Sequence, residues 1–226
     1  MLGALSLRLK SCISALRKRI GAAIRGGEPL WQDLSPEARR KMWPAARDLQ
    51  EKHVRNCQLL VNRYVLLERM PKNAICAEIG ILECDYSESI VRGTGPAQLH
   101  LIDIKPQWTK VARKRFKSEI AANQVCVHEG DSVAVISSMP DRYFDWIYID
   151  GDHTYAGAKR DLDAVLPKVK EGGLIALNDY TFFGVSDFTK YGVMEAVHEF
   201  CITNDFEFLF LALQGRGYHD VILRRI

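Results

Sequence analysis

The chain has 226 residues, of which 47% are hydrophobic and 26% charged, and this globular composition excludes low complexity or disorder for most of its length. No apolar run approaches the roughly 20 residues that a membrane-spanning helix needs. The six cysteines form no CxxC pair, which disfavours a disulfide scaffold or a zinc ribbon and indicates a reducing, cytoplasmic compartment.

The N-terminal segment is basic and has the period of an amphipathic helix. Residues 1–27 contain six of the 31 bases and none of the 28 acids, so the rest of the chain is mildly acidic and nucleic acid is not an expected partner. Three interpretations stay open for this segment. It is a helix that packs on its own domain or a partner, a peripheral membrane contact through residues 1–26, or a cleaved targeting peptide.

Residues 28–72 are expected to form a helical cap. Ser35 followed by Pro36 is typical of a helix N-cap with proline at the first helical position. A helical period then runs from Leu59 to Leu67, and Pro71 ends it.

From residue 73 to residue 226, short apolar runs alternate with helical stretches. The expected strands are 74–80, 98–104, 125–128, 144–150 and 174–177. The expected helices are 87–92, 109–123, 132–138, 155–169 and 193–201. This alternation predicts an α/β, Rossmann-like domain with a mostly parallel sheet, and the adjacent runs 207–213 and 221–225 predict an antiparallel pair at its edge.

Polar residues follow each of the five parallel strands, and ligands of open parallel sheets bind at these carboxyl ends. They are Glu78, Gly80, Asp103, Gly130, Asp131, Asp150, Asp152, His153, Asn178 and Asp179. No G-x-G-x-x-G follows the first strand, which disfavours a nicotinamide-dependent oxidoreductase. An acid at the second strand end suits a ribose diol and an acid at the third suits an adenine amino group, so adenosine without phosphates is the expected ligand.

The motifs at these ends, in this order and spacing, resemble those of the class I S-adenosylmethionine-dependent methyltransferases. The matching stretches are 77–80, 102–103, 129–132 and the long block from 148 through 171–173 to 178–180. The resemblance is closest to the sugar O-methyltransferases of the macrocin and mycinamicin type. It implies a seven-stranded sheet with an antiparallel last strand.

The resemblance also implies the cofactor contacts. It assigns Glu78 and Gly80 to the methionine end of S-adenosylmethionine, Asp103 to the ribose and Asp131 to the adenine. It adds further cofactor-binding positions, which are Gly130, Ser132 and Asp150. In one departure from the family, Cys84 occupies a position that is often a second glycine.

A second group of polar residues suggests a metal. Carboxylate and amide oxygens suit Mg²⁺, and the sugar-methylating relatives place a metal at the positions of Asp150, Asn178 and Asp179, with His153 as the base. Those relatives usually have a carboxylate where this chain has Asn178. In the alternative interpretation, Asn178 and Asp179 cap a loop and His153 is structural.

Together these features predict an O-methyltransferase that acts on a hydroxyl of a small molecule or sugar-containing metabolite, with magnesium assistance. A non-catalytic, membrane-tethered module that binds S-adenosylmethionine is the alternative, and the nicotinamide oxidoreductase is the weaker one. The acceptor and any homo-oligomer stay open.

Overall fold

The computed structural model describes residues 34–38, 46–184 and 189–226. The described residues from 46 onward belong to one compact unit, and residues 34–38 belong to another. In the latter, Ala38 N donates to Ser35 Oγ (3.1 Å), as expected for the predicted N-cap. The basic helix predicted for residues 1–26 lies outside the described residues. Within the described part of the chain, no helix is long and apolar enough to cross a membrane.

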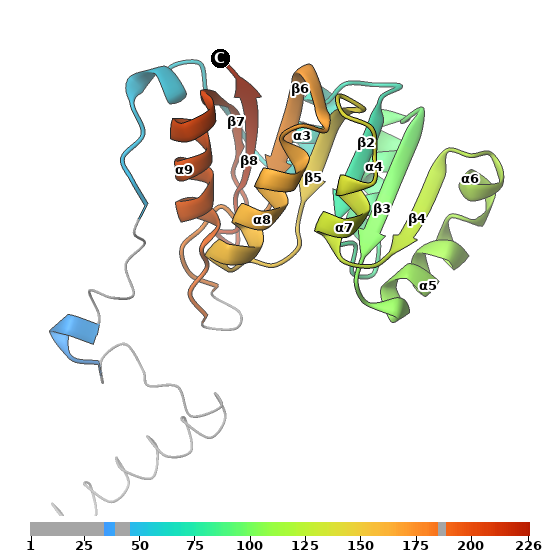
Figure 1. The fold of residues 1–226 in the computed structure, drawn as a ribbon, viewed down its shortest axis with the longest axis horizontal. Coiled ribbons are helices and arrows are strands. Elements are labelled where there is room, and N and C mark those ends of the chain that lie inside the picture. Colours follow the sequence, from blue (N-terminus) through green and yellow to red (C-terminus); the bar gives the residue numbers. More distant parts are fainter. Residues whose placement is uncertain (1–33, 39–45, 185–188) are drawn as a thin grey trace, which may run out of the picture. The chain divides into compact units, whose positions relative to one another are not determined.

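The larger unit is built on one eight-stranded sheet in the order β1-β7-β8-β6-β5-β2-β3-β4 (Figure 1). Strands β2 to β6 are parallel to one another, and β8 runs antiparallel to both β6 and β7. The strand bounds are Gln58–Leu60 (β1), Ile75–Ile79 (β2), Gln98–Asp103 (β3), Val125–Glu129 (β4), Phe144–Ile149 (β5), Val169–Leu177 (β6), Phe206–Ala212 (β7) and Asp220–Arg225 (β8). The α/β, Rossmann-like fold and the antiparallel last strand are thereby confirmed.

The predicted count of seven strands is wrong, because β1 adds an eighth. This strand pairs in parallel with β7 and lies in the stretch that was expected to be helical. The physical reason is Asn62, whose extended backbone and side chain cap a helix that begins only at Arg63. Its Oδ1 accepts from Tyr64 N (2.9 Å) and Val65 N (3.0 Å), which leaves the preceding residues free to pair with the sheet.

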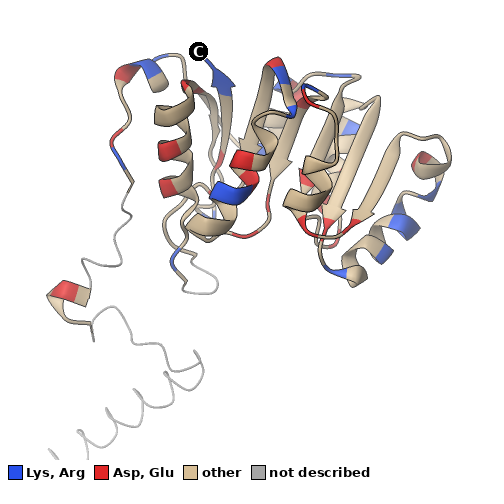
Figure 2. Cartoon of the chain, in the orientation of Figure 1, with Lys and Arg blue, Asp and Glu red and all other residues tan. Residues whose placement is uncertain are grey.

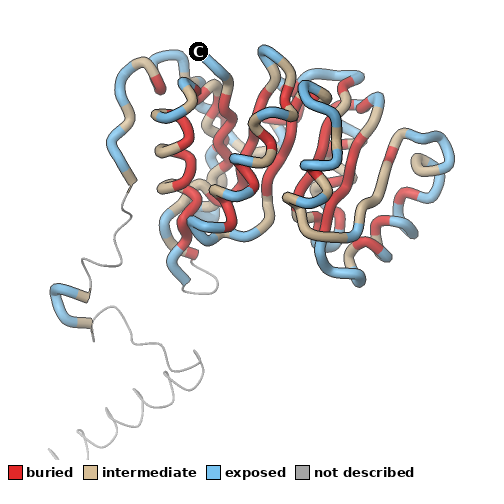
Figure 3. Tube along the Cα trace, in the orientation of Figure 1, coloured by how far each residue is buried: buried red, intermediate tan, exposed pale blue. Residues whose placement is uncertain are grey.

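Helices cover both faces of the sheet, as expected for parallel strands. In the larger unit they are Glu51–His53 (3₁₀), Arg63–Arg69 (α3), Asp85–Thr94 (α4), Pro106–Arg115 (α5), Lys117–Ala121 (α6), Ser132–Ser137 (α7), Tyr155–Val165 (α8) and Val193–Asn204 (α9). One core cluster joins the sheet to α7, α8 and α9, and another joins it to α3, α4 and α5. The central strands are therefore buried along most of their length (Figure 3).

A buried histidine pair in this sheet predicts an acid-sensitive fold. His100 on β3 is 5% exposed, and its Nδ1 lies 2.9 Å from His128 Nε2 on β4. Burial, with a smaller effect of His128, lowers the pKa of His100 to about 4 from 6.5. Below pH 6.5 this histidine therefore binds a proton in the unfolded chain but not in the folded protein. The free energy of unfolding falls as the pH decreases from 6.5 to the folded pKa of about 4.

At about 1.4 kcal/mol per pKa unit, His100 alone contributes at most about 3 kcal/mol to this loss. We expect His100→Gln to reduce the loss of unfolding free energy between pH 7 and pH 5, measured by urea unfolding. An unchanged difference between the two pH values would show that this histidine is not the cause.

Candidate functional site

The carboxyl ends of the parallel strands are tied together by backbone hydrogen bonds. Gly80 N donates to Ile102 O (2.9 Å), Asp150 N to Ile79 O (2.7 Å) and Gly130 N to the Asp103 carbonyl (3.0 Å). The sequence-predicted residues of neighbouring strands are therefore held at one edge of the sheet. Acidic residues line the loops along this edge (Figure 2).

A cavity of about 670 Å³ opens at this edge, within the usual range for small-molecule and cofactor sites. Six of the seven predicted cofactor residues line it, namely Gly80, Asp103, Gly130, Asp131, Ser132 and Asp150. Glu78 is the one that does not. Gly80 is required by close approach, since a Cβ built on it would lie 2.0 Å from the Asp150 carbonyl oxygen. Its φ of +82° is also in the left-handed region that favours glycine.

Asp103 is fixed by the backbone around it. Its Oδ2 accepts from Ile81 N (3.0 Å) and its Oδ1 from Lys105 N (2.8 Å), while the residue stays 9% exposed and lines the cavity. Carboxylate oxygens have more than one acceptor site each. The side chain can therefore accept hydroxyl groups of a ligand without giving up its backbone contacts.

The adenine end of the predicted site contains partners that the sequence did not indicate. Asp131 caps α7 by accepting from Ala134 N (3.1 Å) and pairs with Arg160 (2.8 Å). These two contacts lower the pKa of Asp131. Ser132 Oγ donates to Asp161 Oδ1 (2.5 Å). Arg160 and Asp161 lie on α8, where helical periodicity alone gave no reason to choose them.

Glu78 lies behind the cavity lining. It is 1% exposed, and burial raises the pKa of its carboxyl to about 8. Its Oε2 has no hydrogen-bond partner, and neither do the buried hydroxyls of Tyr86 and Ser87. These three atoms, one near the end of β2 and two at the start of α4, are buried polar atoms that a polar group of a ligand would satisfy.

Cys84 adopts φ +65°, which explains why glycine suits this position. Its side chain is buried in the core cluster that contains Ile81 and Ile90, and it is not part of the cavity lining. The departure from the family pattern therefore places a thiol in the core and not in the cavity.

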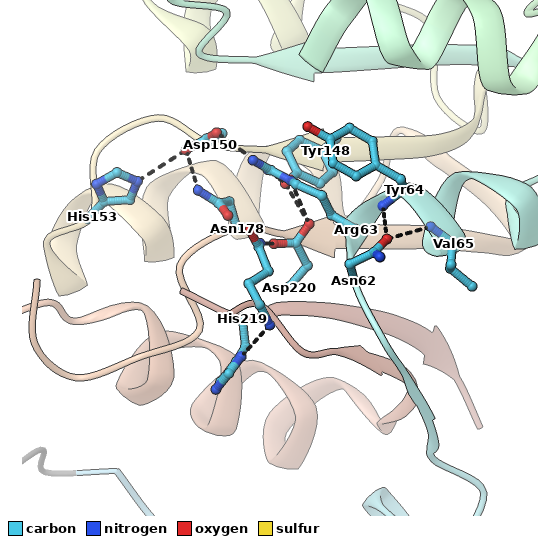
Figure 4. Close-up of polar contacts among 11 residues, drawn as sticks. Asn62, Arg63, Tyr64, Val65, Tyr148, Asp150, His153, Asn178, His219 and Asp220 are labelled. Carbon is cyan, nitrogen blue, oxygen red and sulfur yellow. Dashed lines mark hydrogen bonds and ion pairs between the residues drawn. The ribbon is translucent and has the colours of Figure 1, made fainter. Parts of the chain in front are cut away.

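The predicted metal residues form a centre at the rim of the cavity, and Figure 4 shows Asp150, His153 and Asn178 of this group. Ligand atoms of Asp150, His153 and Asp179 lie within 4.8 Å of one another. His153 Nε2 is 3.3 Å from Asp150 Oδ1 and 3.3 Å from Asp179 Oδ2. Asn178 donates from its amide to Asp150 Oδ1 (3.0 Å). The four residues predicted from the sequence are thus brought together.

Burial and charge shift the proton affinities of this centre. Burial lowers the pKa of His153, but the hydrogen bond to Asp150 and the charges of Asp179, Asp150 and Asp152 outweigh it, so the pKa is raised. Burial and then the charge of Asp150 raise the pKa of Asp179 to about 6. Asp179 also has φ +55°, a strained conformation of the kind that gathers at functional sites.

The donor set of this centre fits a divalent cation. Two carboxylates and an imidazole nitrogen converge, and the buried Oδ1 of Asn178 has no hydrogen-bond partner. The presence of an imidazole in the cluster broadens the set of suitable metals beyond Mg²⁺, since imidazole also suits transition metals.

Arg63 is the main residue of this centre that sequence reasoning missed. It follows the carboxyl end of β1 and begins α3. Its Nη2 donates to Tyr148 Oη and lies 3.9 Å from Asp150 Oδ2. Because β1 was not predicted, nothing in the sequence placed this arginine at the ligand edge of the sheet.

On the other side of the centre, the ring of Tyr191 stacks on His153, with the ring centroids 4.8 Å apart. The backbone carbonyl of His153 accepts from Gly192 N (2.8 Å), which joins the two segments. Among the nearby aromatic residues, Trp108 lines the cavity, whereas Tyr180 packs against His198 and Phe208.

Comparison with known proteins found one family model and several similar structures. Residues 86–180 match the family model described as a methyltransferase domain. None of the curated proteins matches the sequence. Among solved structures, the pyocyanin biosynthetic protein PhzM is similar with a TM-score of 0.56 at 15% identity, covering 72% of this chain and 54% of PhzM.

Two further structures are similar in the same way. Precorrin-6y C5,15-methyltransferase from Geobacter metallireducens has a TM-score of 0.55 at 18% identity, covering 73% of this chain and 85% of its own. The trans-methyltransferase CalH, solved with S-adenosylhomocysteine, has a TM-score of 0.54 at 15% identity, covering 73% of this chain and 55% of its own. This chain thus spans about half the length of PhzM and of CalH. Residues 86–180 thus match a methyltransferase domain model, and the similar structures share the α/β, Rossmann-like fold of this chain.

Proposed function

We propose that the protein transfers a methyl group from S-adenosylmethionine to a hydroxyl of a small molecule or a sugar-containing metabolite, with the assistance of a divalent cation. One observation carries the proposal, namely that Asp150 and His153 belong both to the cavity lining and to the acid–histidine centre. A methyl donor in the cavity and an acceptor oxygen at the centre would therefore meet at these two residues.

The cofactor assignment is supported by the polar groups around the cavity. Asp103 would accept hydrogen bonds from the ribose hydroxyls, and the Asp131 region would bind the adenine. The Oε2 atom of Glu78, which has no hydrogen-bond partner, would accept a hydrogen bond from a donor such as the methionine ammonium. S-Adenosylhomocysteine (SAH) carries the same three groups. It is therefore a suitable probe for binding without turnover.

Methyl transfer from a sulfonium is an in-line displacement, so alignment of the acceptor oxygen with the methyl carbon supplies much of the rate. Asp150, Asp179 and Asn178 would hold a cation, with Mg²⁺ first to be tested. When bound, the cation would stabilise the negative charge that develops on the acceptor oxygen. His153 would take the hydroxyl proton at Nε2, the atom that faces both carboxylates.

Radiolabelled methyl transfer tests this function. The full chain is freed of metal with EDTA and then assayed with S-adenosylmethionine and a panel of phenolic, polyketide and glycoside hydroxyl acceptors. We expect turnover with at least one class of acceptor after Mg²⁺ or Mn²⁺ is restored, and none in EDTA. Full activity in EDTA would contradict the metal assistance, and label on nitrogen or carbon would contradict O-methylation.

A non-catalytic binding module remains the second candidate. It is favoured by the ion pairs that join His153 to both carboxylates, since they close the centre without a cation. Tight SAH binding without turnover of any acceptor would support it.

In either case, we propose that residues 1–26 provide a peripheral membrane contact and that nucleic acid is not the substrate.

A further inference from the structure

Arg63, the first residue of α3, contacts residues of α4, β5 and β8. Its side chain is 18% exposed, and the guanidinium carbon lies 4.0 Å from the centroid of the Tyr86 ring. Its Nε lies 3.3 Å from Asp220 Oδ2, at the start of β8. Figure 4 shows the guanidinium between Tyr148, Asp150 and Asp220. Such a flat, forked cation can contact several partners at once.

Asp150 is held from two sides. Its Oδ1 faces His153 Nε2 (3.3 Å) and Asn178 Nδ2 (3.0 Å), whereas its Oδ2 faces Arg63 Nη2 (3.9 Å). The arginine therefore approaches the carboxylate oxygen that is turned away from the other candidate metal ligands. Rotation of the carboxylate would exchange these contacts.

Asp220 is not the only polar partner of Arg63. Asp220 is fully buried, and its carboxylate also accepts from Tyr148 Oη (2.8 Å) and from Gln214 Nε2 (2.6 Å). Two neutral donors thus already serve Asp220. The guanidinium also contacts Tyr148 and faces Asp150. If Arg63 served only to neutralise Asp220, these two contacts would not be needed.

We propose that Arg63 is a positioning residue of the candidate metal centre, which holds Asp150 with Oδ1 toward His153 and Asn178. This inference rests on the proposed metal assistance and goes beyond it, because Arg63 is neither a ligand nor a base. Groups that orient a metal ligand from behind typically contribute 10- to 100-fold to metal affinity or activity.

The test compares variants in which Asp220 is never left as a buried, unpaired carboxylate. Removing Arg63 alone would leave Asp220 buried beside no cation, which itself threatens folding. The double variant Arg63→Met/Asp220→Asn is therefore compared with Asp220→Asn, so that the two differ only at Arg63. Arg63→Lys tests whether charge without the fork is enough. Arg69→Ala, an exposed arginine on the same helix, is the control.

Binding of Mn²⁺ to each full-length protein is measured from free Mn²⁺ by electron paramagnetic resonance, with SAH binding measured by calorimetry. We expect the double variant to bind Mn²⁺ about 10- to 100-fold more weakly than Asp220→Asn, with Arg63→Lys in between and SAH affinity retained. Equal Mn²⁺ affinity of the double variant and Asp220→Asn would overturn the proposal.

If the wild-type protein binds no Mn²⁺, the metal part of the proposed function fails, and the role of Arg63 is judged from crystal structures of the same two variants. We then expect the contact between Asp150 Oδ1 and His153 Nε2 to be kept in Asp220→Asn and lost in the double variant. Retention of that contact in the double variant would overturn the positioning role.

Discussion

Replacement of His153 by alanine is expected to lower kcat by about 10²- to 10⁴-fold, the usual contribution of a positioned base. Affinity for SAH should be retained, because Asp103 and the adenine end of the cavity are untouched. Turnover at saturating acceptor, together with calorimetry of SAH, measures both effects. A variant that keeps the wild-type kcat would exclude His153 as the base.

Mn²⁺ binding to the same variant separates two roles for this imidazole. His153 Nε2 is close enough to Asp150 and Asp179 to act either as a base or as a metal ligand. As a base, its loss should leave Mn²⁺ bound, while Asp179→Ala should lose both Mn²⁺ and turnover. If His153→Ala also loses Mn²⁺, the imidazole is a ligand and another group must take the proton.

Gly80→Ala is expected to remove SAH binding and to destabilise the fold. The added methyl group would lie 2.0 Å from the Asp150 carbonyl oxygen, so the ends of β2 and β5 must move apart. The left-handed backbone adds about 1–2 kcal/mol of strain. Urea unfolding and SAH calorimetry would measure the two effects.

Gly217→Ala is the matched control for this prediction. Gly217 has nearly the same φ, +81° against +82°, but a Cβ there would meet nothing within 4 Å. It should therefore lose only the conformational part of the stability and keep SAH binding. Equal losses in the two variants would show that close approach to Asp150 is not what requires Gly80.

Much of the site could be predicted because parallel strands place their carboxyl ends together. Asp103, Asp131 and Asp150 each follow a different strand of the parallel sheet. Because these strands lie close together in the sheet, the three residues line one cavity. The same reasoning joined Asp150 to Asp179. Alternating apolar runs also placed the strands of the central sheet, since both of its faces are buried.

What could not be predicted depends on contacts between distant segments. Arg63 shares a helical period with Leu59 and Leu67, and that pattern hid the strand before it. Only pairing of β1 with β7, together with the cap at Asn62, brings the arginine to the ligand edge. Likewise, the buried position of Glu78 behind the cavity depends on the packing of α4, which periodicity does not specify.

Calorimetric titration of SAH into the full-length protein tests the central claim most directly. The cavity and its acidic strand ends predict saturable binding that Asp103→Ala weakens strongly, while Asp141→Ala, an exposed acid far from the cavity lining, leaves it unchanged. Folding of each variant is checked by thermal unfolding. Absence of binding at millimolar SAH in the folded wild-type protein would contradict the assignment of this cavity to S-adenosylmethionine.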